Sequence, residues 1–353
     1  MEQVLAGFRD RIVAATNSGS PLRLRGNGTK DWYGQQLQGE VLDTTPYTGI
    51  VDYDPTELVI TARCGTNLRE IGKALSAHNQ MLAFEPPRFD GMATIGGIVA
   101  AGLSGPRRMA VGAARDFVLG AVMMDGRGEV LHFGGQVMKN VAGYDVSRLL
   151  TGSLGTLGLI LEVSVKVLPK PVAQQSLRFA MTETEALHQL NVWGGQPLPI
   201  SASCWHQGQL SVRLSGARAA VDAAIIKMGG EVLADADTFW DQLREHQSAF
   251  FADTSEGLWR LSVPSAAAPL QLPGEQVIEW GGAQRWLKTS ADATTIRAAA
   301  EAAGGHAMLY RGGDKSVGVF HPLKTPVANI HRRLKASFDP AGIFNPQRMY
   351  PDF

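Results

Sequence analysis

The sequence predicts an α+β protein built from two domains. The chain has 353 residues, more than one domain usually holds, and 44% of them are hydrophobic, which is enough for a sizeable core. Strand-like and helix-like patterns alternate along the chain. Glycine is concentrated in one part of it, because residues 91–158 hold 15 of the 40 glycines. That density indicates a segment in which the backbone approaches other groups closely or adopts positive φ.

Charge and cysteine content exclude several classes of protein. Lys plus Arg and Asp plus Glu each number 33, so no net charge attracts nucleic acid or an acidic membrane surface. Cys64 and Cys204 form neither a CxxC pair nor a zinc-ligand spacing, which is typical of a reducing cytoplasm. Residues 1–19 lack the regions of a signal peptide, and no apolar run approaches the ~18 residues of a membrane span. We therefore expect a cytoplasmic protein.

The first half of the chain predicts helices and paired strands. Its elements are an amphipathic helix over residues 1–19, strands over 21–26, 49–55 and 57–65, a hairpin over 116–134 and a strand over 158–171. A further helix is expected over residues 66–80, with Asn67 as its cap and Glu70 as the capping-box partner. Its apolar face would comprise Leu68, Ile71, Leu75 and His78.

The composition of the chain changes after Pro171. Glycine becomes less frequent there, and strand-like segments alternate with helix-like ones. This pattern predicts an α+β domain with an antiparallel sheet of split βαβ units. We place the domain boundary near Val172, so that residues 1–172 form one domain and residues 173–330 another. Residues 331–353 are expected to leave the second domain and return to the first.

Three glycine-rich loops abut strands, at residues 25–29, 94–105 and 152–158. Such loops expose backbone N–H groups and can bind phosphate, although each could also be a tight turn in a crowded core. Three of them together favour one extended ligand, such as a dinucleotide. A Rossmann site is not expected, because Asp31 stands where the third glycine of GxGxxG would lie, and the Walker pattern is absent.

The order of these motifs resembles a known family. The segments LRLRGNGT, TIGGIVAAGLSG, GYDVSRLLTGSLGTLG and FDPAGIFNP occur as in FAD-linked oxidases of the vanillyl-alcohol-oxidase or PCMH type. Within that family the chain is most similar to the FAD-binding E subunits of bacterial glycolate oxidases. The resemblance is dense over residues 20–172 and 338–346 and weaker between them. It implies a two-lobed PCMH-type FAD-binding domain and an α+β cap domain.

The resemblance also implies non-covalent FAD and a set of contacts to it. Thr29 stands where members with covalent flavin often have histidine. The first loop would wrap the pyrophosphate, the second would form a further phosphate wall and the flavin side, and the third would meet the adenine end. The implied contacts are Arg25, Gly26, Asn27, Gly28, Thr29, Pro86, Pro87, Thr94, Ile95, Gly96, Gly97, Gly102, Leu103, Ser104, Gly112, Arg115, Asp116, Gly143, Gly155, Ile160 and Asn345. Structural alternatives are packing glycines, an Arg115–Asp116 ion pair and a turn at Asn345.

The sequence identifies no catalytic residue and no metal site. Oxidation of a 2-hydroxy acid needs a carboxylate clamp and a base. His321 and Arg311 are candidates, but histidine before proline and loop arginine are usually structural. The histidines are scattered without the clustering of metal ligands. The family's NPGK ending is NPQR here, with Gln347 and Arg348.

We therefore expect the FAD-binding subunit of a complex that oxidises glycolate to glyoxylate and passes electrons to an iron–sulfur partner. A sister flavoprotein would be another partner, and two cysteines are too few for a cluster in this chain. One alternative is a self-contained FAD-dependent 2-hydroxy-acid or sugar dehydrogenase, and another is a non-catalytic assembly subunit with structural FAD. Attachment to the inner membrane through the complex is compatible with a cytoplasmic chain. Candidate interface residues in the cap, or alternatively core residues, are Trp193, Trp205, Trp240 and Trp259.

Overall fold

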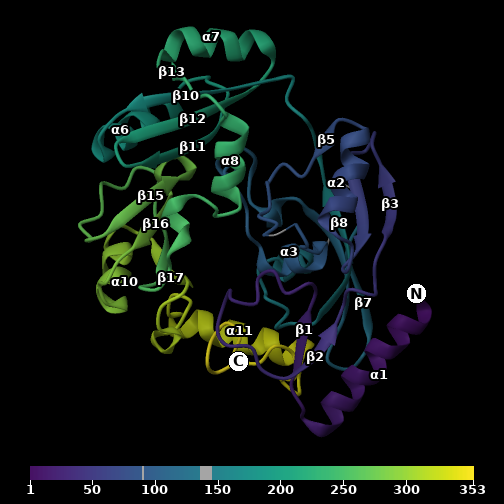
Figure 1. The fold of residues 1–353 in the computed structure, drawn as a ribbon. Helices are drawn as coiled ribbons and strands as arrows, with labels where there is room; N and C mark the ends of the chain where they lie inside the picture. Colours follow the sequence, from purple (N-terminus) through teal and green to yellow (C-terminus); the bar gives the residue numbers. More distant parts are fainter. Residues whose placement is uncertain (90, 136–144) are drawn as a thin grey trace. The chain divides into compact units, whose positions relative to one another are not determined.

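The structure is a computed structural model that describes residues 1–89, 91–135 and 145–353. Its contacts divide the chain into two units. Unit 1 comprises Met1–Ser104, Ala113–Pro169 and Pro322–Phe353, and unit 2 comprises Gly105–Gly112 and Lys170–His321. The domain boundaries at 172 and 330 and their functional assignments stay predictions. The mixture of helices and sheets confirms the expected α+β class (Figure 1).

Unit 1 is built on a five-stranded antiparallel sheet in the order β3-β4-β8-β6-β7. The central strand β8 has six of its eight residues buried, which explains its nearly continuous apolar sequence. Residues 118–134 form the predicted hairpin of β6 and β7. The strands are β3 (Ile50–Asp54), β4 (Val59–Arg63), β6 (Val118–Met124), β7 (Val130–Gly134) and β8 (Leu159–Lys166), and a separate short pair is β5 (Gln80–Met81) with β9 (Leu168–Pro169).

Two predicted helices of unit 1 are confirmed, α1 (Glu2–Ser18) and α2 (Leu68–Ala77). The Asn67 side chain caps α2 by accepting a hydrogen bond from the Arg69 N–H at 2.8 Å. Leu68, Ile71 and Leu75 are buried as expected. The prediction for His78 was wrong, because His78 follows the last helical turn and is exposed.

The second glycine-rich segment forms a helix, α3 (Ile95–Ala101), where the sequence predicted a loop. Glycine in a helix costs about 1 kcal/mol relative to alanine, but packing outweighs that cost here. A Cβ at Gly96 would lie only 2.6 Å from the Cβ of Cys64, so glycine permits the helix to pack closely against that residue. Gly102 then ends the helix in the left-handed region with φ of 64°.

The C-terminal segment lies within unit 1. Strand β1 (Leu22–Arg25) pairs in parallel with β2 (Glu40–Asp43), and Leu22 also forms a parallel bridge with Phe344. Helix α11 (Thr325–Phe338) precedes this bridge, and the short helix α5 (Val146–Leu150) completes the helices described in unit 1.

Lys335 is a buried cation that fixes the end of α11. Its Nζ donates hydrogen bonds to the Thr156 carbonyl at 2.7 Å, to Asp339 Oδ2 at 2.6 Å and to the Phe344 carbonyl at 2.7 Å. Asp339 in turn accepts hydrogen bonds from the N–H groups of Ile343 and Phe344. Burial lowers the pKa of Lys335, and the neighbouring Asp339 carboxylate opposes that shift. The pair therefore ties α11, the segment after it and the turn at Thr156 together.

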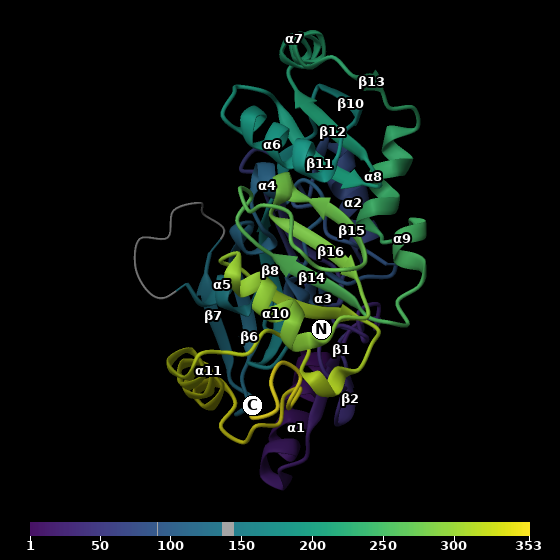
Figure 2. The same cartoon turned by 90° about the vertical axis from the view of Figure 1, so that its left-hand side faces the viewer.

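Unit 2 is an eight-stranded antiparallel sheet in the order β13-β10-β12-β11-β15-β16-β14-β17. Its first half follows the predicted split βαβ pattern, because the chain order β10-α6-β11-β12-α7-β13 gives this strand order. Leu177 packs in the core cluster formed with α6 and α7. The neighbouring Ser176 points to the opposite face, where its Oγ accepts a hydrogen bond from Trp240 of α8 at 2.9 Å. Figure 2 shows α6 and α8 on opposite sides of the sheet.

The strands of unit 2 are β10 (Ala173–Ala180), β11 (Ile200–His206), β12 (Gln209–Gly216), β13 (Glu231–Val232), β14 (Leu258–Ser262), β15 (Glu275–Glu279), β16 (Gln284–Lys288) and β17 (His306–Arg311). Its helices are α4 (Arg108–Val111), α6 (Glu183–Gly194), α7 (Arg218–Met228), α8 (Ala236–Arg244), α9 (Ala249–Ala252) and α10 (Ala293–Ala302).

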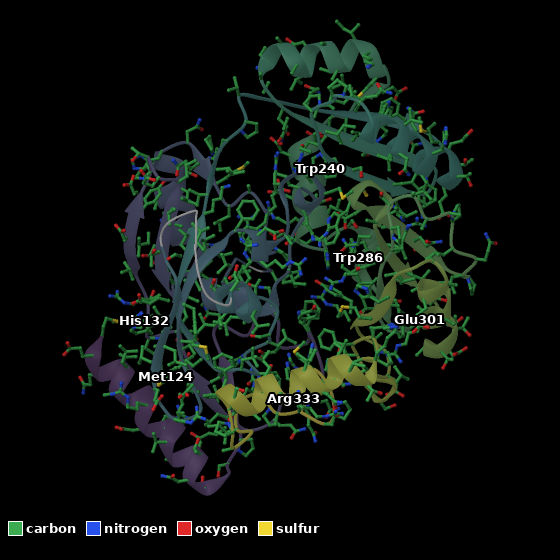
Figure 3. The ribbon with its side chains drawn as sticks, turned by 180° about the vertical axis from the view of Figure 1, so that it is seen from behind. Met124, His132, Trp240, Trp286, Glu301 and Arg333 are labelled. Carbon is green, nitrogen blue, oxygen red and sulfur yellow. The ribbon has the colours of Figure 1, made fainter. Side chains whose placement is uncertain are left out.

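The tryptophans proposed as a partner surface belong to the interior of unit 2. Trp193, Trp240 and Trp259 are buried, and Trp240 is labelled in Figure 3. Trp205 is half-buried and donates a hydrogen bond to the Met181 carbonyl at 2.9 Å. These residues therefore support the core alternative.

We predict that Lys335→Met lowers the free energy of unfolding by about 3–5 kcal/mol, because it leaves a buried carboxylate without its cation. Urea denaturation followed by circular dichroism measures this change. Arg333→Met on the exposed side of the same helix is the matched control and is expected to change stability by about 0.5 kcal/mol or less. Equal effects of the two substitutions would contradict the assigned role of Lys335.

Candidate functional site

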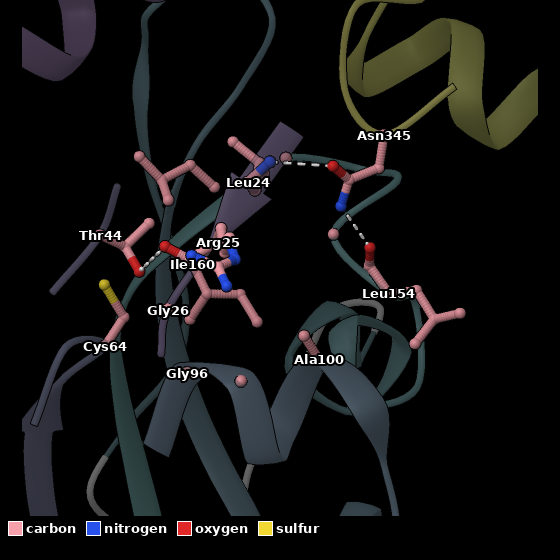
Figure 4. Close-up of a pocket in the computed structure, with 14 residues that line it drawn as sticks. Leu24, Arg25, Gly26, Thr44, Cys64, Gly96, Ala100, Leu154, Ile160 and Asn345 are labelled. Carbon is pink, nitrogen blue, oxygen red and sulfur yellow. Dashed lines mark hydrogen bonds between the residues drawn. The ribbon is translucent and has the colours of Figure 1, made fainter. Parts of the chain in front are cut away.

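Two adjoining hollows in unit 1 form the candidate site. The first has a volume of about 60 Å³ and the second about 100 Å³. Both are bounded by the first glycine loop, by α3, by the turn at Leu154 and by Asn345. Figure 4 shows the first hollow with these elements around it. Segments more than 300 residues apart in sequence therefore line one site.

The Asn345 side chain braces the walls of both hollows. Its Oδ1 accepts a hydrogen bond from the Leu24 N–H at 2.9 Å, and its Nδ2 donates to the Leu154 carbonyl at 2.6 Å (Figure 4). Gly155, beside this bond, has φ of 71°, and a Cβ there would lie 2.8 Å from Asn345 Nδ2. The two hydrogen bonds of the Asn345 amide thus require glycine at position 155.

The first glycine loop offers donors to an anion. The N–H groups of residues 26–29 donate no hydrogen bond within the described part of the chain. Asn27 anchors the loop, because its Nδ2 donates to the Met92 carbonyl at 2.7 Å. Gly28 supplies the positive φ, 70°, that the turn needs. Consecutive free N–H groups in such a turn form a concavity suited to phosphate.

Cationic side chains surround this loop. Arg25, Lys30 and Arg348 line the second hollow together with Asp31. The Arg25 Nε lies 2.8 Å from Asp31 Oδ2, and Arg23 pairs with the same carboxylate. These three cations and one paired carboxylate leave the second hollow with an excess of positive charge.

Arg348 is a buried member of this cationic wall. It is only 5% exposed, and its Nη2 donates to the Asp31 carbonyl at 2.9 Å. Burial lowers the pKa of Arg348 to about 10, with Asp31 opposing the shift, so the guanidinium remains charged near neutral pH. The arginine that replaces the family's lysine therefore keeps its charge, and its contacts hold the loop backbone.

Gly96 and Gly97 leave room for close packing and for the hollows because they lack a Cβ, whereas their N–H groups already donate hydrogen bonds within the protein. The Gly96 N–H donates to the Cys64 carbonyl at 2.9 Å, and the Gly97 N–H donates to Thr94 Oγ1 at 3.3 Å. Both residues lie in α3, so the glycine-rich loop expected here is helical, and the N–H groups of Gly96 and Gly97 have partners within the protein. Gly97 lines both hollows, and a Cβ there would meet only Thr94 Oγ1, at 3.2 Å.

The opposite wall of the first hollow is neutral. Cys64 follows β4 and Thr44 follows β2, and both residues line this hollow. Burial raises the pKa of the Cys64 thiol to about 12, so the thiol stays protonated at neutral pH. The Thr44 hydroxyl donates to the Arg25 carbonyl at 3.2 Å. This wall suits an uncharged group next to the cationic loop.

About half of the predicted contacts come together here. Those lining one or both hollows are Arg25, Gly26, Asn27, Gly28, Thr29, Thr94, Gly96, Gly97, Gly155, Ile160 and Asn345. Their contact with a cofactor stays a prediction.

The other predicted contacts that the structure describes do not line the hollows, and their contact with a cofactor also stays a prediction. Ile95, Leu103, Pro86 and Pro87 are buried. Ser104 Oγ accepts a hydrogen bond from the Ala114 N–H at 2.9 Å, and the Asp116 carboxylate accepts one from the Ala113 N–H at 2.8 Å. The remaining ones are Gly102 at the end of α3, Gly112 in unit 2, and Arg115, which is 3.9 Å from Asp116. Gly143 lies outside the described residues.

Sequence reasoning missed part of the lining. The residues missed are Leu24, Lys30, Asp31, Leu37, Thr44, Cys64, Leu159 and Arg348. Ala100, Ala101, Leu154 and Gly158 also line the hollows; they belong to the predicted glycine-rich loops but were not among the implied contacts. Lys30 and Asp31 directly follow the first glycine loop, and their adjacency could have found them. Thr44 and Cys64 each follow a strand, but nothing local predicts that these strand ends meet.

The catalytic candidates His321 and Arg311 belong to unit 2 and are not among the residues that line the hollows. His321 Nε2 lies 2.9 Å from Glu301 Oε1, and its Nδ1 accepts a weak hydrogen bond from the Ala307 N–H at 3.4 Å. This pairing gives His321 a structural partner. In the described residues, no group of three or more His, Cys, Asp or Glu side chains is arranged to hold a metal ion. No described helix has both the length and the apolar character to cross a membrane.

Comparisons with known proteins give three findings. Residues 8–134 match the family described as FAD binding domain. The chain is 48% identical over 343 residues to glycolate oxidase subunit GlcE of Escherichia coli (strain K12), covering 97% of this chain and 96% of that protein. It is 34% identical over 161 residues to glycolate oxidase subunit GlcD of Bacillus subtilis (strain 168), covering 44% of this chain and 34% of that protein.

The fold is also similar to a solved structure of alkyldihydroxyacetonephosphate synthase. The TM-score is 0.64 at 16% identity, covering 97% of this chain and 75% of that chain. At this identity the likeness concerns the fold alone.

We predict that Asn345→Ala destabilises the protein by about 1–3 kcal/mol for each of the two partners that it leaves unsatisfied. Thermal and urea unfolding measure the loss. Asn329→Ala, on the exposed side of α11, is the matched control and is expected to be nearly neutral. An Asn345→Ala protein as stable as the parent would show that the brace is dispensable.

Proposed function

Because the chain belongs to the family of the glycolate oxidase subunit GlcE, we propose that it is the FAD-binding subunit of a complex that oxidises glycolate to glyoxylate. The observation that carries the proposal is 48% identity spread over 97% of the chain and 96% of the relative. Such coverage includes unit 2 as well as the part that matches the FAD binding domain family. The chain and its relative therefore share both units, not only a cofactor domain.

The residues of the candidate site fit a diphosphate-bearing cofactor. The free N–H groups of residues 26–29 and the charges of Arg25, Lys30 and Arg348 would hold the FAD diphosphate. Gly97 leaves the adjoining space clear, and the neutral Thr44–Cys64 wall suits an uncharged portion of the cofactor. In this proposal the two hollows would hold the diphosphate and its neighbouring groups, and the rest of FAD would extend beyond them.

FAD is bound non-covalently in this proposal, and when bound it supplies the two-electron chemistry of hydroxy-acid oxidation. The chain's own residues would hold the cofactor through the free N–H groups of residues 26–29 and the neighbouring cationic side chains. None of the described residues that line the hollows is a suitable base. Asp31 is paired with Arg23 and Arg25, and the thiol pKa of Cys64 is about 12. Because the reacting part of FAD would lie beyond the hollows, their lining does not identify the proton-accepting group, and we propose from the family relationship that the sister flavoprotein supplies it.

The partners follow from the family. GlcE and GlcD are both named as glycolate oxidase subunits, which supports a multi-subunit complex for this chain as well. We propose a sister flavoprotein and an iron–sulfur subunit as its partners. Both cysteines of this chain are buried and isolated from each other, and a cluster with four cysteine ligands needs a different chain.

We predict that Gly97→Val yields soluble protein that is largely free of FAD. The new side chain would enter both hollows, while its Cβ would press only on Thr94 Oγ1. The measurement is FAD absorbance in the supernatant after acid precipitation, compared with the parent protein.

The same measurement on the parent protein tests non-covalent binding. Release of the yellow colour into the supernatant is expected, and colour retained in the pellet would contradict non-covalent binding.

The matched control for this experiment is Gly96→Val. A Cβ at Gly96 would collide with the Cβ, Cα and carbonyl oxygen of Cys64, at 2.6–3.0 Å, so misfolding is expected rather than selective loss of FAD. Full FAD occupancy in soluble Gly97→Val protein would refute the assignment of the hollows.

We predict that the isolated FAD-loaded chain does not reduce its flavin rapidly when mixed anaerobically with glycolate or D-lactate. Stopped-flow absorbance of the flavin band measures this directly, and adding the sister flavoprotein with the iron–sulfur subunit should restore glycolate oxidation. Bleaching by the isolated chain at ~1–10³ per second, the usual enzyme range, would instead establish the self-contained dehydrogenase.

A further inference from the structure

We propose that unit 2 contains a second ligand site, which binds an uncharged small molecule with an apolar body and a hydrogen-bonding group. The site is a cavity of about 460 Å³ between α4, α6 and the first residues of β11. Cavities of this size commonly hold small organic ligands. It shares no residue with the two hollows of unit 1.

One side of the cavity is apolar. Leu190 and Trp193 line it from α6, and Leu198 and Ile200 line it from the segment that leads into β11. Trp193 is 6% exposed and stands within the core cluster of this half of the sheet. Met109 of α4 faces the same space and is 52% exposed. A buried floor with an exposed methionine at its edge suits an apolar ring or chain that enters from solvent.

The polar atoms in the lining include groups that make no hydrogen bond to a described residue and are therefore available to a ligand. Asn191 uses its Nδ2 to donate to the Leu187 and Ser265 carbonyls, and its Oδ1 accepts nothing within the described residues. The side-chain amide of Gln196 makes no hydrogen bond to any described residue. Ser203 Oγ accepts from the Gly281 N–H at 2.9 Å, which leaves its hydroxyl hydrogen free to donate. These groups can bind a carbonyl or hydroxyl of a ligand.

The lining contains no Asp, Glu, Lys, Arg or His residue. Burying a carboxylate or phosphate there would remove its hydration without supplying a counter-charge. The cavity therefore disfavours glycolate, glyoxylate and the FAD diphosphate, and it selects an uncharged compound.

The α4 wall is fixed by specific contacts within unit 2. The Arg108 guanidinium lies over the Trp280 ring at 4.3 Å, and Trp280 Nε1 donates to the Gly105 carbonyl at 3.1 Å. These contacts hold the residues that directly precede Met109 and Ala110, the two residues of α4 that line the cavity. The walls of the site therefore come from four separate stretches of the chain, at residues 109–110, 190–203, 265 and 281.

The test compares two probes of similar shape that differ in charge, 2-acetylnaphthalene and 2-naphthoate. Each is titrated into the FAD-loaded chain by isothermal calorimetry. We expect the neutral ketone to bind at one site and the carboxylate to bind at least about tenfold more weakly, a difference of about 1.4 kcal/mol. Absence of ketone binding, or equal binding of both probes, would overturn the proposal.

Gly194→Phe locates the binding site. A Cβ at Gly194 meets no atom within 4 Å, so the aromatic ring can fill the cavity without displacing the protein. Gly7→Phe is the matched control, because Gly7 also lies in a helix with no atom within 4 Å of a Cβ. Ketone binding is expected to be lost in Gly194→Phe and kept in Gly7→Phe.

Ala110→Phe places a ring in the same cavity from α4. This second variant keeps the test decisive if Gly194→Phe does not fold. Ketone binding unchanged by either folded occluding variant would refute the location. FAD content is measured in every variant and is expected to stay at the parental level. A loss of ketone binding can therefore be distinguished from a loss of FAD binding at the proposed cofactor site.

Discussion

The amide of Asn345 is the interaction on which the candidate site depends. With two hydrogen bonds it joins the end of β1 to the turn at Leu154, although its own position is near the C-terminus. Lys335 secures the same C-terminal segment by binding the Phe344 carbonyl and the Thr156 carbonyl. Both side chains satisfy backbone groups that would otherwise be buried without partners. The geometry of the hollows is thus set by tertiary contacts rather than by any one loop.

Close packing also accounts for much of the glycine in this region. A Cβ at Gly26 would lie 2.5 Å from Thr94 Oγ1, and one at Gly155 would lie 2.8 Å from Asn345 Nδ2. These glycines allow the loops to approach one another, whereas residues 26–29 provide the free N–H groups. The first loop therefore combines both roles of glycine, because Gly26 permits close contact with Thr94 and also belongs to the run of free N–H groups.

Features that depend on neighbours in sequence were predictable. The cap of α2 at Asn67, the hairpin of β6 and β7 and the split βαβ order in unit 2 all follow from local patterns. Helix α3 was not predictable, because contact of Gly96 with Cys64 outweighs the poor helix propensity of glycine. Arg348 and Thr44 reach the site only through the fold, so no spacing in the sequence could have placed them together.

The assignment of Gly105–Gly112 to unit 2, while its flanking residues belong to unit 1, has a consequence for dissecting the protein. A fragment of residues 170–321 would lack Arg108 and Gly105, and Trp280 would lose both its stacked cation and its hydrogen-bond acceptor. A continuous fragment that covers the first part of unit 1 would conversely contain residues 105–112 without the sheet of unit 2, on which they pack. The two units are encoded by interleaved stretches of sequence, so recombination between related genes at a single crossover cannot exchange one unit intact for another.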